Sequence, residues 1–337
     1  MTVARPEEET GQETPPDPPQ SLWHNREFLK FWSGEGLSLF GTQVTNLALP
    51  LTAVLYFNAT AQQVGLLRFL QWVPYLLLAM LFGVWVDRHR RKPIMVMANT
   101  VRMLGIALIP LLAYYDLLSI TGLLIIACLV GVFSVLFDVS WMSFVPTLVR
   151  HPRHYVEANQ QLGVTQSTTD VAGPGVAGVL VGWLGPPTAL VVDAMSYLAS
   201  LTMLLLIRTP EPAPPPAADR HVGRELVEGV RWVFGHRLLR PLALLAPLTN
   251  FSLTCVSTLF LLYAVRDKGL NAATVGLILS VSAVGALGGA LVSRAFIRRY
   301  PVGVVYGVAL AAVSATPLLF VQVTRINSTG SAGMGRN

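Results

Sequence analysis

Charge and cysteine are both scarce in this chain. Charged residues make up 12% of the sequence, and Cys128 and Cys255 are its two cysteines. Both lie inside apolar segments, so we expect small core residues and neither a disulfide framework nor a metal site. The chain also lacks a Gly-x-x-x-x-Gly-Lys-Ser/Thr phosphate loop, zinc-ligand spacing and a nucleophile elbow. These absences argue against an enzyme and against a bound metal or cofactor.

Apolar residues are abundant instead. They form 53% of the sequence, too high a share for a soluble protein of this size. A helix needs about 20 mostly apolar residues to cross a bilayer. About nine such stretches are present, near 33–56, 64–86, 94–115, 120–142, 161–184, 188–207, 241–265, 273–296 and 303–323. The sequence therefore predicts an all-α polytopic membrane protein with the lipid bilayer as its solvent.

Basic residues are concentrated in alternate loops. One set of segments, including the loop from Arg88 to Lys92, holds about 18 of the 24 Lys and Arg residues. The positive-inside rule places these segments and the amino terminus in the cytoplasm. We expect a multi-pass protein of the cell (inner or plasma) membrane, with no nucleic-acid partner despite the net charge of +6.

Composition divides the chain into five parts. Residues 1–24 are acidic and proline-rich, typical of a disordered cytoplasmic tail, and show no signal-peptide pattern. Residues 25–207 hold six apolar stretches. Residues 208–236 form a linker, rich in Pro and Ala up to 220 and then patterned as an amphipathic helix expected to lie flat on the inner leaflet. Residues 237–323 hold three more stretches, and 324–337 form a polar tail.

The segment after the linker is a weak repeat of the first. Identical residue types recur at a spacing of 211 residues. The pairs are Arg26 and Arg237, Gly65 and Gly276, Leu66 and Leu277, and Arg88 and Arg299. Parallel repeats of bundled helices are a known architecture of secondary transporters, so the repeat indicates a transporter.

Three motifs carry a resemblance to a known family. They are Asn25 to Phe28 continuing through Gly41 to Val44, the loop from Gly83 to Lys92, and the helix from Glu225 to Arg240. In these motifs the chain resembles drug exporters of the major facilitator superfamily, in the branch of macrolide and enterobactin exporters. The resemblance implies proton-coupled efflux of amphipathic, drug- or macrolide-like small molecules by alternating access. Full-length members are expected to be monomers, and siderophore or metabolite export is the alternative.

The loop between the second and third stretches needs a tight reversal and a backbone approach at Gly83. The resemblance implies that it is a conformational latch. Asp87 would sit at the start of a second-half helix, and Arg91, beside Arg88, would join a carboxylate of the fourth helix, here Asp138. A plain cytoplasmic anchor is the alternative interpretation.

A small-residue motif lies in the fifth stretch. Gly173, Pro174 and Gly178 resemble the Gly-Pro signature of exporters that exchange substrate for protons. Small residues and a missing backbone donor predict a bent, closely packed helix. We expect its partner to be the glycines of the eighth stretch, Gly285, Gly288 and Gly289, although ordinary helix packing would use the same residues.

Ionisable residues inside a membrane cost about 2.5–3.5 kcal/mol each, so each needs a partner or a function. From their depths we predict the pairs Arg102 with Asp138 and Arg68 with Asp193. Glu35 lies near the inner mouth, where its side chain can also snorkel, and Asp170 has no cation at matching depth. The candidates for proton coupling, with structural pairing as the alternative, are Glu35, Arg102, Asp138, Asp170 and Asp193.

A path for an amphipathic substrate needs polar groups among apolar and aromatic walls. The resemblance implies that the first, fourth, seventh and tenth helices line it. The candidates are Gln43, Asn46, Phe137, Trp141, Asn250 and Ser257. The aromatic residues can equally face lipid.

The end of the sequence departs from the family pattern. The resemblance implies twelve spans in two six-helix halves, but the apolar stretches stop after nine. Residues 324–337 are polar where a tenth span is expected, which predicts a frameshift or a premature stop. The alternative from another class is therefore an inactive or non-transporting membrane fragment.

Overall fold

The computed structural model describes residues 22–149, 152–211, 222–237, 239–297, 299–300, 304 and 307–308, and all its regular structure there is helical. The helices are α1 (Arg26–Leu51), α2 (Ala61–Asp87), α3 (Arg91–Tyr114), α4 (Ile120–Leu148), α5 (Pro152–Leu184), α6 (Pro186–Leu206), α7 (Val222–Gly235), α8 (Leu239–Leu262) and α9 (Ala272–Ile297). Eight of the nine predicted stretches correspond to α1–α6, α8 and α9. Most of the ninth, with the tails 1–21 and 324–337, lies outside the described residues.

Polar side chains define several helix starts. The Asn25 side chain accepts hydrogen bonds from the first amides of α1. Thr60 and Gln63 form a capping box at the start of α2, and the Ser119 hydroxyl accepts from Gly122 N at the start of α4. These bonds satisfy amides that have no partner inside the helix, a need that is acute where water is scarce.

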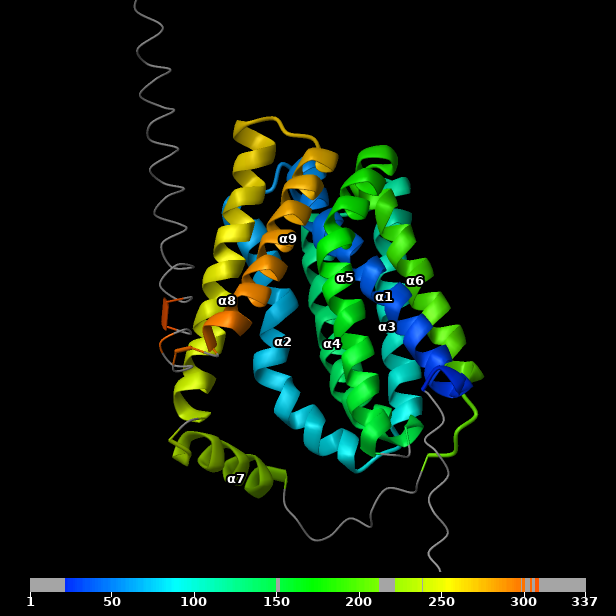
Figure 1. The fold of residues 1–337 in the computed structure, drawn as a ribbon. Helices are drawn as coiled ribbons and strands as arrows, with labels where there is room; N and C mark the ends of the chain where they lie inside the picture. The colour runs from blue at the N-terminus through cyan, green and yellow to red at the C-terminus, as the bar shows by residue number, and fades with distance from the viewer. Residues whose placement is uncertain are drawn as a thin grey trace, which may run out of the picture.

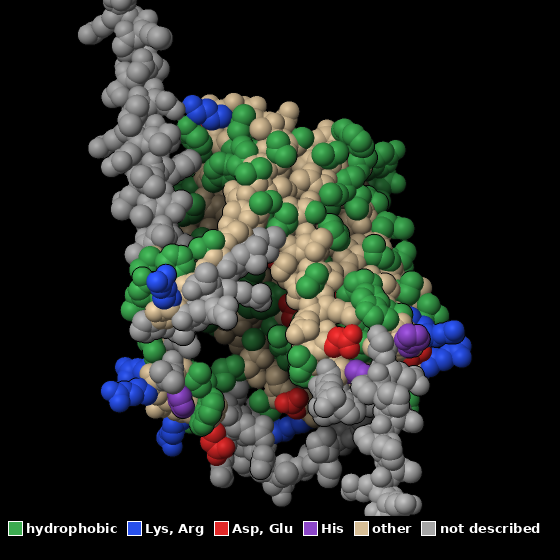
Figure 2. Space-filling model, in the orientation of Figure 1, with side chains coloured by type: hydrophobic (Ala, Val, Ile, Leu, Met, Phe, Trp, Pro, Cys, Tyr) green, Lys and Arg blue, Asp and Glu red, His purple; other side chains and the backbone are tan. Residues whose placement is uncertain are grey.

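The helices form one elongated bundle with an apolar outer surface (Figures 1 and 2). By length and composition, six helices of the described part can cross a membrane: α1, α2, α3, α4, α6 and α8. The more polar α5 packs against α1 and α9, and α7 lies across one end of the bundle (Figure 1). Large apolar side chains such as Leu76 and Trp183 are exposed on the outside, as a lipid-facing surface requires.

The fold repeats itself at the spacing seen in the sequence. α1 continues into a π-helical turn over Thr52–Tyr56, and α8 continues into one over Tyr263–Asp267. After each turn the chain passes through a left-handed residue, Asn58 (φ 50°) in the first case and Gly269 (φ 62°) in the second. Each pair of matching residues is 211 positions apart, so the two segments share a local backbone design as well as residue types.

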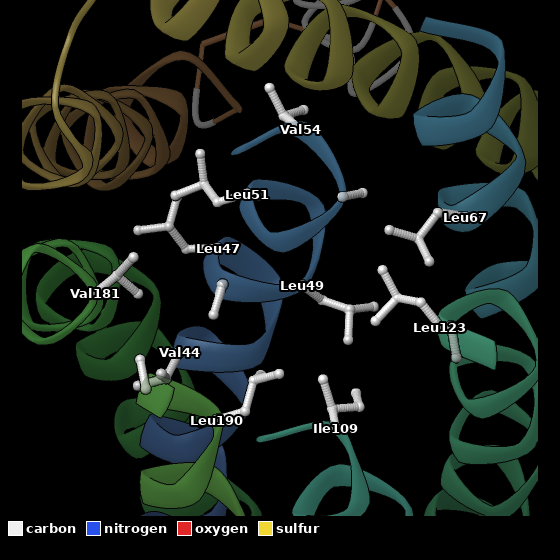
Figure 3. Packing of buried hydrophobic residues seen from close by; sticks show 14 of the residues in the cluster. Val44, Leu47, Leu49, Leu51, Val54, Leu67, Ile109, Leu123, Val181 and Leu190 are labelled. Carbon is white, nitrogen blue, oxygen red and sulfur yellow. The ribbon is translucent and has the colours of Figure 1, made fainter. Parts of the chain in front are cut away.

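The main apolar core joins the two segments. It includes side chains from α1 to α6 and from the end of α8 and start of α9. Figure 3 shows part of it, with Val44, Leu47, Leu49 and Leu51 of α1 and Val54 of the π-helical turn surrounded by Leu67, Ile109, Leu123, Val181 and Leu190. This core lies toward the end of the bundle opposite α7, so it holds that end closed.

Candidate functional site

Helices α5 and α9 pack backbone against backbone at the closed end. A Cβ atom added to Gly178 would lie 2.7 Å from the Ala272 carbonyl oxygen and 2.9 Å from Gly276 Cα. Glycine is needed here because neighbouring backbone cannot move aside as a side chain can. The predicted partners of Gly178 were wrong: Cβ atoms built on Gly285, Gly288 and Gly289 meet nothing within 4 Å.

The two segments separate toward the end that carries α7. The α5–α9 contact continues at Gly175, where an added Cβ would lie 2.9 Å from Ser280 Oγ, and gives way to open space at Gly285. In Figure 2 this face is hollowed in its lower half. At the other end, Arg266 donates a hydrogen bond to the carbonyl oxygen of Ala59, which joins the second segment to the first.

A cavity of about 100 Å³ lies between the two segments. Its wall combines apolar side chains with four polar ones, Gln43, Asn46, Arg68 and Ser257. Three of these, Gln43, Asn46 and Ser257, are among the residues predicted for the substrate path. Pro174 of the small-residue motif also lines it. The cavity is therefore amphipathic, as small-molecule sites usually are.

Asp170 lies one helical turn from Pro174 and connects to this wall. Its Oδ1 accepts hydrogen bonds from Gln43 Nε2 at 3.0 Å and from Gln166 Nε2 at 2.9 Å. The residue is exposed, and no salt bridge to it occurs among the described residues. Asp170 thus places a carboxylate beside the cavity.

The other predicted path residues lie elsewhere. Phe137 is buried in a second apolar core, where its ring faces the Arg102 guanidinium, so its assignment to the path was wrong. Trp141 packs against the same core, with its ring centroid 6.4 Å from that of Phe31. Asn250 is exposed on α8 and is not part of the cavity wall. Residue type and depth did not fix the direction in which these side chains point.

Arg102 is the centre of a buried polar network. Its guanidinium donates to the Tyr197 hydroxyl at 2.9 Å and to Asn99 Oδ1 at 3.3 Å, and Asn99 in turn donates to Ser200. The guanidinium carbon lies 4.3 Å from the Tyr197 ring centroid and 5.0 Å from that of Phe137. Two rings and neutral oxygens therefore surround the cation.

Two carboxyl groups lie near this network without contacting Arg102. The predicted ion pair between Arg102 and Asp138 was wrong, since none joins them in the described chain; Asp138 Oδ2 instead accepts from the Tyr75 hydroxyl at 2.6 Å. Glu35 is buried and does not snorkel, and its Oε2 has no hydrogen-bond partner. Both carboxyl groups still interact electrostatically with Arg102.

The predicted pair of Arg68 with Asp193 was also wrong. Asp193 is buried between α6 and α1, where it accepts hydrogen bonds from Thr45 and, at 3.0 Å, from Ser196. Arg68 Nη2 instead donates to the carbonyl oxygen of Asn46 at 2.8 Å. Each ionisable group is thus held by neutral partners of its own.

The basic loop is shorter than predicted. α2 continues to Asp87 and α3 begins at Arg91, so the reversal takes three residues. Gly83 is inside α2, and an added Cβ would meet nothing within 4 Å, which contradicts the expected backbone approach. Arg91 lies 4.0 Å from Asp87 and 3.7 Å from Glu211, so its predicted pairing with Asp138 was wrong.

Glu211 is a functional candidate that the sequence reasoning missed. It follows α6 in the linker, and its carboxylate accepts hydrogen bonds from the backbone amides of Arg91 at 2.6 Å and Lys92 at 3.2 Å. A carboxylate at a helix start satisfies free amides and interacts favourably with the helix dipole. An acidic residue between two prolines, Pro210 and Pro212, was the one available signal. Glu211 ties the linker to the Asp87–Arg91 corner.

Replacing Glu211 with Ala is expected to loosen the start of α3. The change removes a buried cap and one ion pair, so the free energy of unfolding should fall by about 1 kcal/mol. Hydrogen exchange should accelerate at the Arg91 and Lys92 amides, measured by mass spectrometry on the detergent-solubilised protein. Glu157→Ala, a change near the start of α5, is the control. Unchanged exchange at these two amides in Glu211→Ala would contradict the capping role.

The geometry defines a class of protein. The chain is a multi-pass membrane protein in which two related helical segments line an amphipathic cavity and pack closely at one end. The family model of the Major Facilitator Superfamily matches residues 31–334. The chain belongs to this superfamily and is a secondary transporter, not an enzyme.

Its similarity to curated relatives is distant. It is 26% identical to the multidrug efflux pump Tap of Mycolicibacterium fortuitum over 83% of the chain and 71% of Tap. It is 22% identical to macrolide efflux protein A of Streptococcus pyogenes (69% and 58% covered), and 26% identical to the enterobactin exporter EntS of Escherichia coli (76% and 60% covered). The chain thus spans about three fifths of the length of the last two.

Solved structures agree on the fold. A bacterial homologue of the iron transporter ferroportin, in an inward-facing state, superposes with a TM-score of 0.61 at 17% identity, covering 83% of this chain and 70% of its own. A bacterial homologue of the human lysosomal transporter Spinster, also inward-facing, gives 0.60 at 17% identity, with 84% and 65% covered. These matches identify a major facilitator fold.

Proposed function

We propose that this protein exports amphipathic small molecules across the cell membrane by alternating access, driven by protons. The observation that carries the proposal is the cavity between the two repeated segments, which pack closely at Gly178 and Gly276 and leave open space at Gly285, toward α7. Alternating access requires a central site that one set of contacts closes at a time. A molecule packed at one end and separated at the other is consistent with one of the two states of this cycle.

The open end is proposed to face the cytoplasm. The loop from Arg88 to Lys92 and residues Arg26, Lys30 and Arg208 lie at the end that carries α7. Figure 2 shows most Lys and Arg of the visible face at that end. Cytoplasmic segments carry such an excess of basic residues, which supports an inward-open orientation with a cytoplasmic amino terminus.

Glu35 is the strongest candidate for proton coupling. It is buried, one of its oxygens lacks a hydrogen-bond partner, and the charges of Asp138 and Arg102 act on it in opposite directions. Taking up a proton neutralises its charge and gives the carboxyl group a hydrogen to donate. Asp138 and Asp193 already have hydroxyl donors, and Asp170 is exposed beside the cavity.

The corner at Asp87 is proposed to be the latch of the opposite state. Its side chain is 70% exposed here, with Arg91 as a neighbour at 4.0 Å. In an inward-open molecule the latch partner in the second half is withdrawn, so an exposed aspartate is the expected arrangement. Closure of the cytoplasmic end would bring a helix start of the second half to Asp87.

Collapse of the proton gradient is the test of this function. The purified chain is reconstituted in proteoliposomes with a panel of fluorescent amphiphiles that carry neutral, cationic or anionic groups. We expect gradient-dependent movement of at least one compound, its loss when an uncoupler is added, and strongly slowed movement in Asp87→Asn. Glu157→Gln is the control. Movement that survives both the uncoupler and Asp87→Asn would refute proton-driven transport through this latch.

Export of a siderophore or another metabolite is the second candidate. The similarity to EntS, an enterobactin exporter, over 76% of this chain favours it. The same panel separates the candidates when a catecholate siderophore is added to it. A preference for that compound over drug-like amphiphiles would identify the second function.

A further inference from the structure

Arg68 places a positive charge in the wall of the central cavity. The residue lies on α2 and lines the cavity with Gln43, Asn46 and Ser257. Its Nη2 donates to the carbonyl oxygen of Asn46, and no carboxylate in the described part of the chain pairs with it. Arg68 lines the cavity, so a ligand held there can reach its guanidinium.

The bond to Asn46 has a clear origin in α1. Pro50, four residues later, has no backbone N–H, so the Asn46 carbonyl lacks its usual helix donor. Arg68 supplies that missing donor. An uncharged side chain with an N–H group could do the same, so this contact uses one donor of the guanidinium and leaves its charge without a counter-ion.

A charge inside a membrane protein is costly unless opposite charges, aromatic rings or several polar atoms compensate it. In the described chain, Arg68 has one hydrogen-bond acceptor, the neutral carbonyl oxygen of Asn46. The rest of the guanidinium can contact a substrate in the cavity that Arg68 lines. We infer that Arg68 recognises an anionic group, such as a carboxylate or a phenolate, on the amphipathic substrate. The cavity wall then combines an anion site with apolar contacts from Leu47, Phe260, Leu261 and Leu279.

Asp170 sets the polarity of this recognition. It lies beside the cavity on the side nearer the opening, held by Gln43 and Gln166. A substrate therefore meets a negative group at Asp170 and a positive one at Arg68. This order favours an amphiphile whose single anionic group leads toward the closed end, and it disfavours a second negative charge near the opening.

This inference deepens the proposed function, because it names the substrate class of the same cavity. It is tested by equilibrium binding, which needs no proton gradient and no transport. The compounds are N-dansylphenylalanine, its neutral methyl ester, and the analogue with an amine in place of the carboxylate, with the purified full chain in nanodiscs. Affinity is measured by the fluorescence change of the dansyl group.

We expect the carboxylate to bind at least about tenfold more tightly than the ester, and the amine to bind most weakly, since hydrogen bonds to charged groups are the stronger ones. Arg68→Gln keeps a donor for the Asn46 carbonyl and should lower affinity for the carboxylate about tenfold while leaving the ester unchanged. Arg68→Lys should retain part of the preference. Arg240→Gln, a charge removal at an exposed site on α8, is the matched control.

Other outcomes decide against the inference. Equal binding of carboxylate and ester by the unaltered protein, tighter binding of the amine, or an unchanged preference in Arg68→Gln would each overturn it. If Arg68→Gln loses all binding, the affinities of the three compounds for the unaltered protein decide: the expected order supports the inference, and any other order overturns it. The titrations are repeated in chloride and in gluconate. Lower carboxylate affinity in chloride, with Arg68→Gln abolishing that difference, would support the inference, because the two anions would then compete for the same cation.

Discussion

Glu35→Gln is expected to remove the response of transport to a pH gradient while leaving substrate binding in place. A gradient of one pH unit supplies about 1.4 kcal/mol per proton, enough for about tenfold accumulation of substrate. Glutamine keeps the size of the side chain but cannot exchange a proton. The accumulation ratio of the best panel compound should therefore fall to about one, as measured in proteoliposomes with an imposed gradient.

The controls separate Glu35 from the other carboxyl groups. Glu157→Gln makes the same chemical change near the start of α5 and should leave the accumulation ratio unaltered. Asp170→Asn, beside the cavity, should change affinity for the substrate more than the response to pH. If Asp170→Asn abolishes the pH response and Glu35→Gln preserves it, the proton site is Asp170 and the assignment to Glu35 is wrong.

The helical architecture could be predicted because it depends on local properties of the sequence. Apolar length located eight of the helices. The repeat of residue types at a spacing of 211 has a structural counterpart in the π-turns after α1 and α8, which were not predicted. Capping residues such as Asn25 and Thr60 mark their helix starts directly. The loop from Gly83 was predicted less well, because glycine and charges resemble a turn even where the helix continues to Asp87.

The contacts of the ionisable groups could not be predicted from depth alone. Arg102 and Asp138 were placed at compatible depths, yet Arg102 turns toward Tyr197 of α6 and Asp138 toward Tyr75 of α2. Rise per residue gives the position along a helix, whereas the partner depends on rotation about its axis and on the neighbouring helix. Glu211 was missed for a related reason, since its contact with α3 spans a chain separation of 120 residues.

Two glycines at equivalent positions of the repeat allow a test of how the closed end is held. A Cβ on Gly276 would lie 2.4 Å from the Pro174 carbonyl oxygen and 2.8 Å from Gly178 Cα, whereas a Cβ on Gly65 would meet nothing within 4 Å. Both glycines lie in the first turns of their helices, α9 and α2. Alanine at each position therefore adds the same methyl group in matching local structure. It clashes with α5 at position 276 and meets nothing at position 65.

Gly276→Ala is expected to force α9 away from α5 and open the closed end. Overpacking of this kind costs about 1–3 kcal/mol, which shifts the balance between the two states by roughly 5- to 150-fold. The measurement uses Ser257→Cys in the cavity wall, with Cys128 and Cys255 replaced by Ser, and a membrane-impermeant thiol reagent applied from either side.

In the unaltered background, labelling should proceed from the side of α7. Gly276→Ala should raise labelling from the opposite side, and Gly65→Ala should leave it unchanged, because its methyl group enters open space. Equal labelling of the two alanine variants from that side would show that the Gly178–Gly276 contact does not control the seal. A rise in Gly276→Ala alone would locate the gate of the closed state at one backbone crossing between the repeated segments.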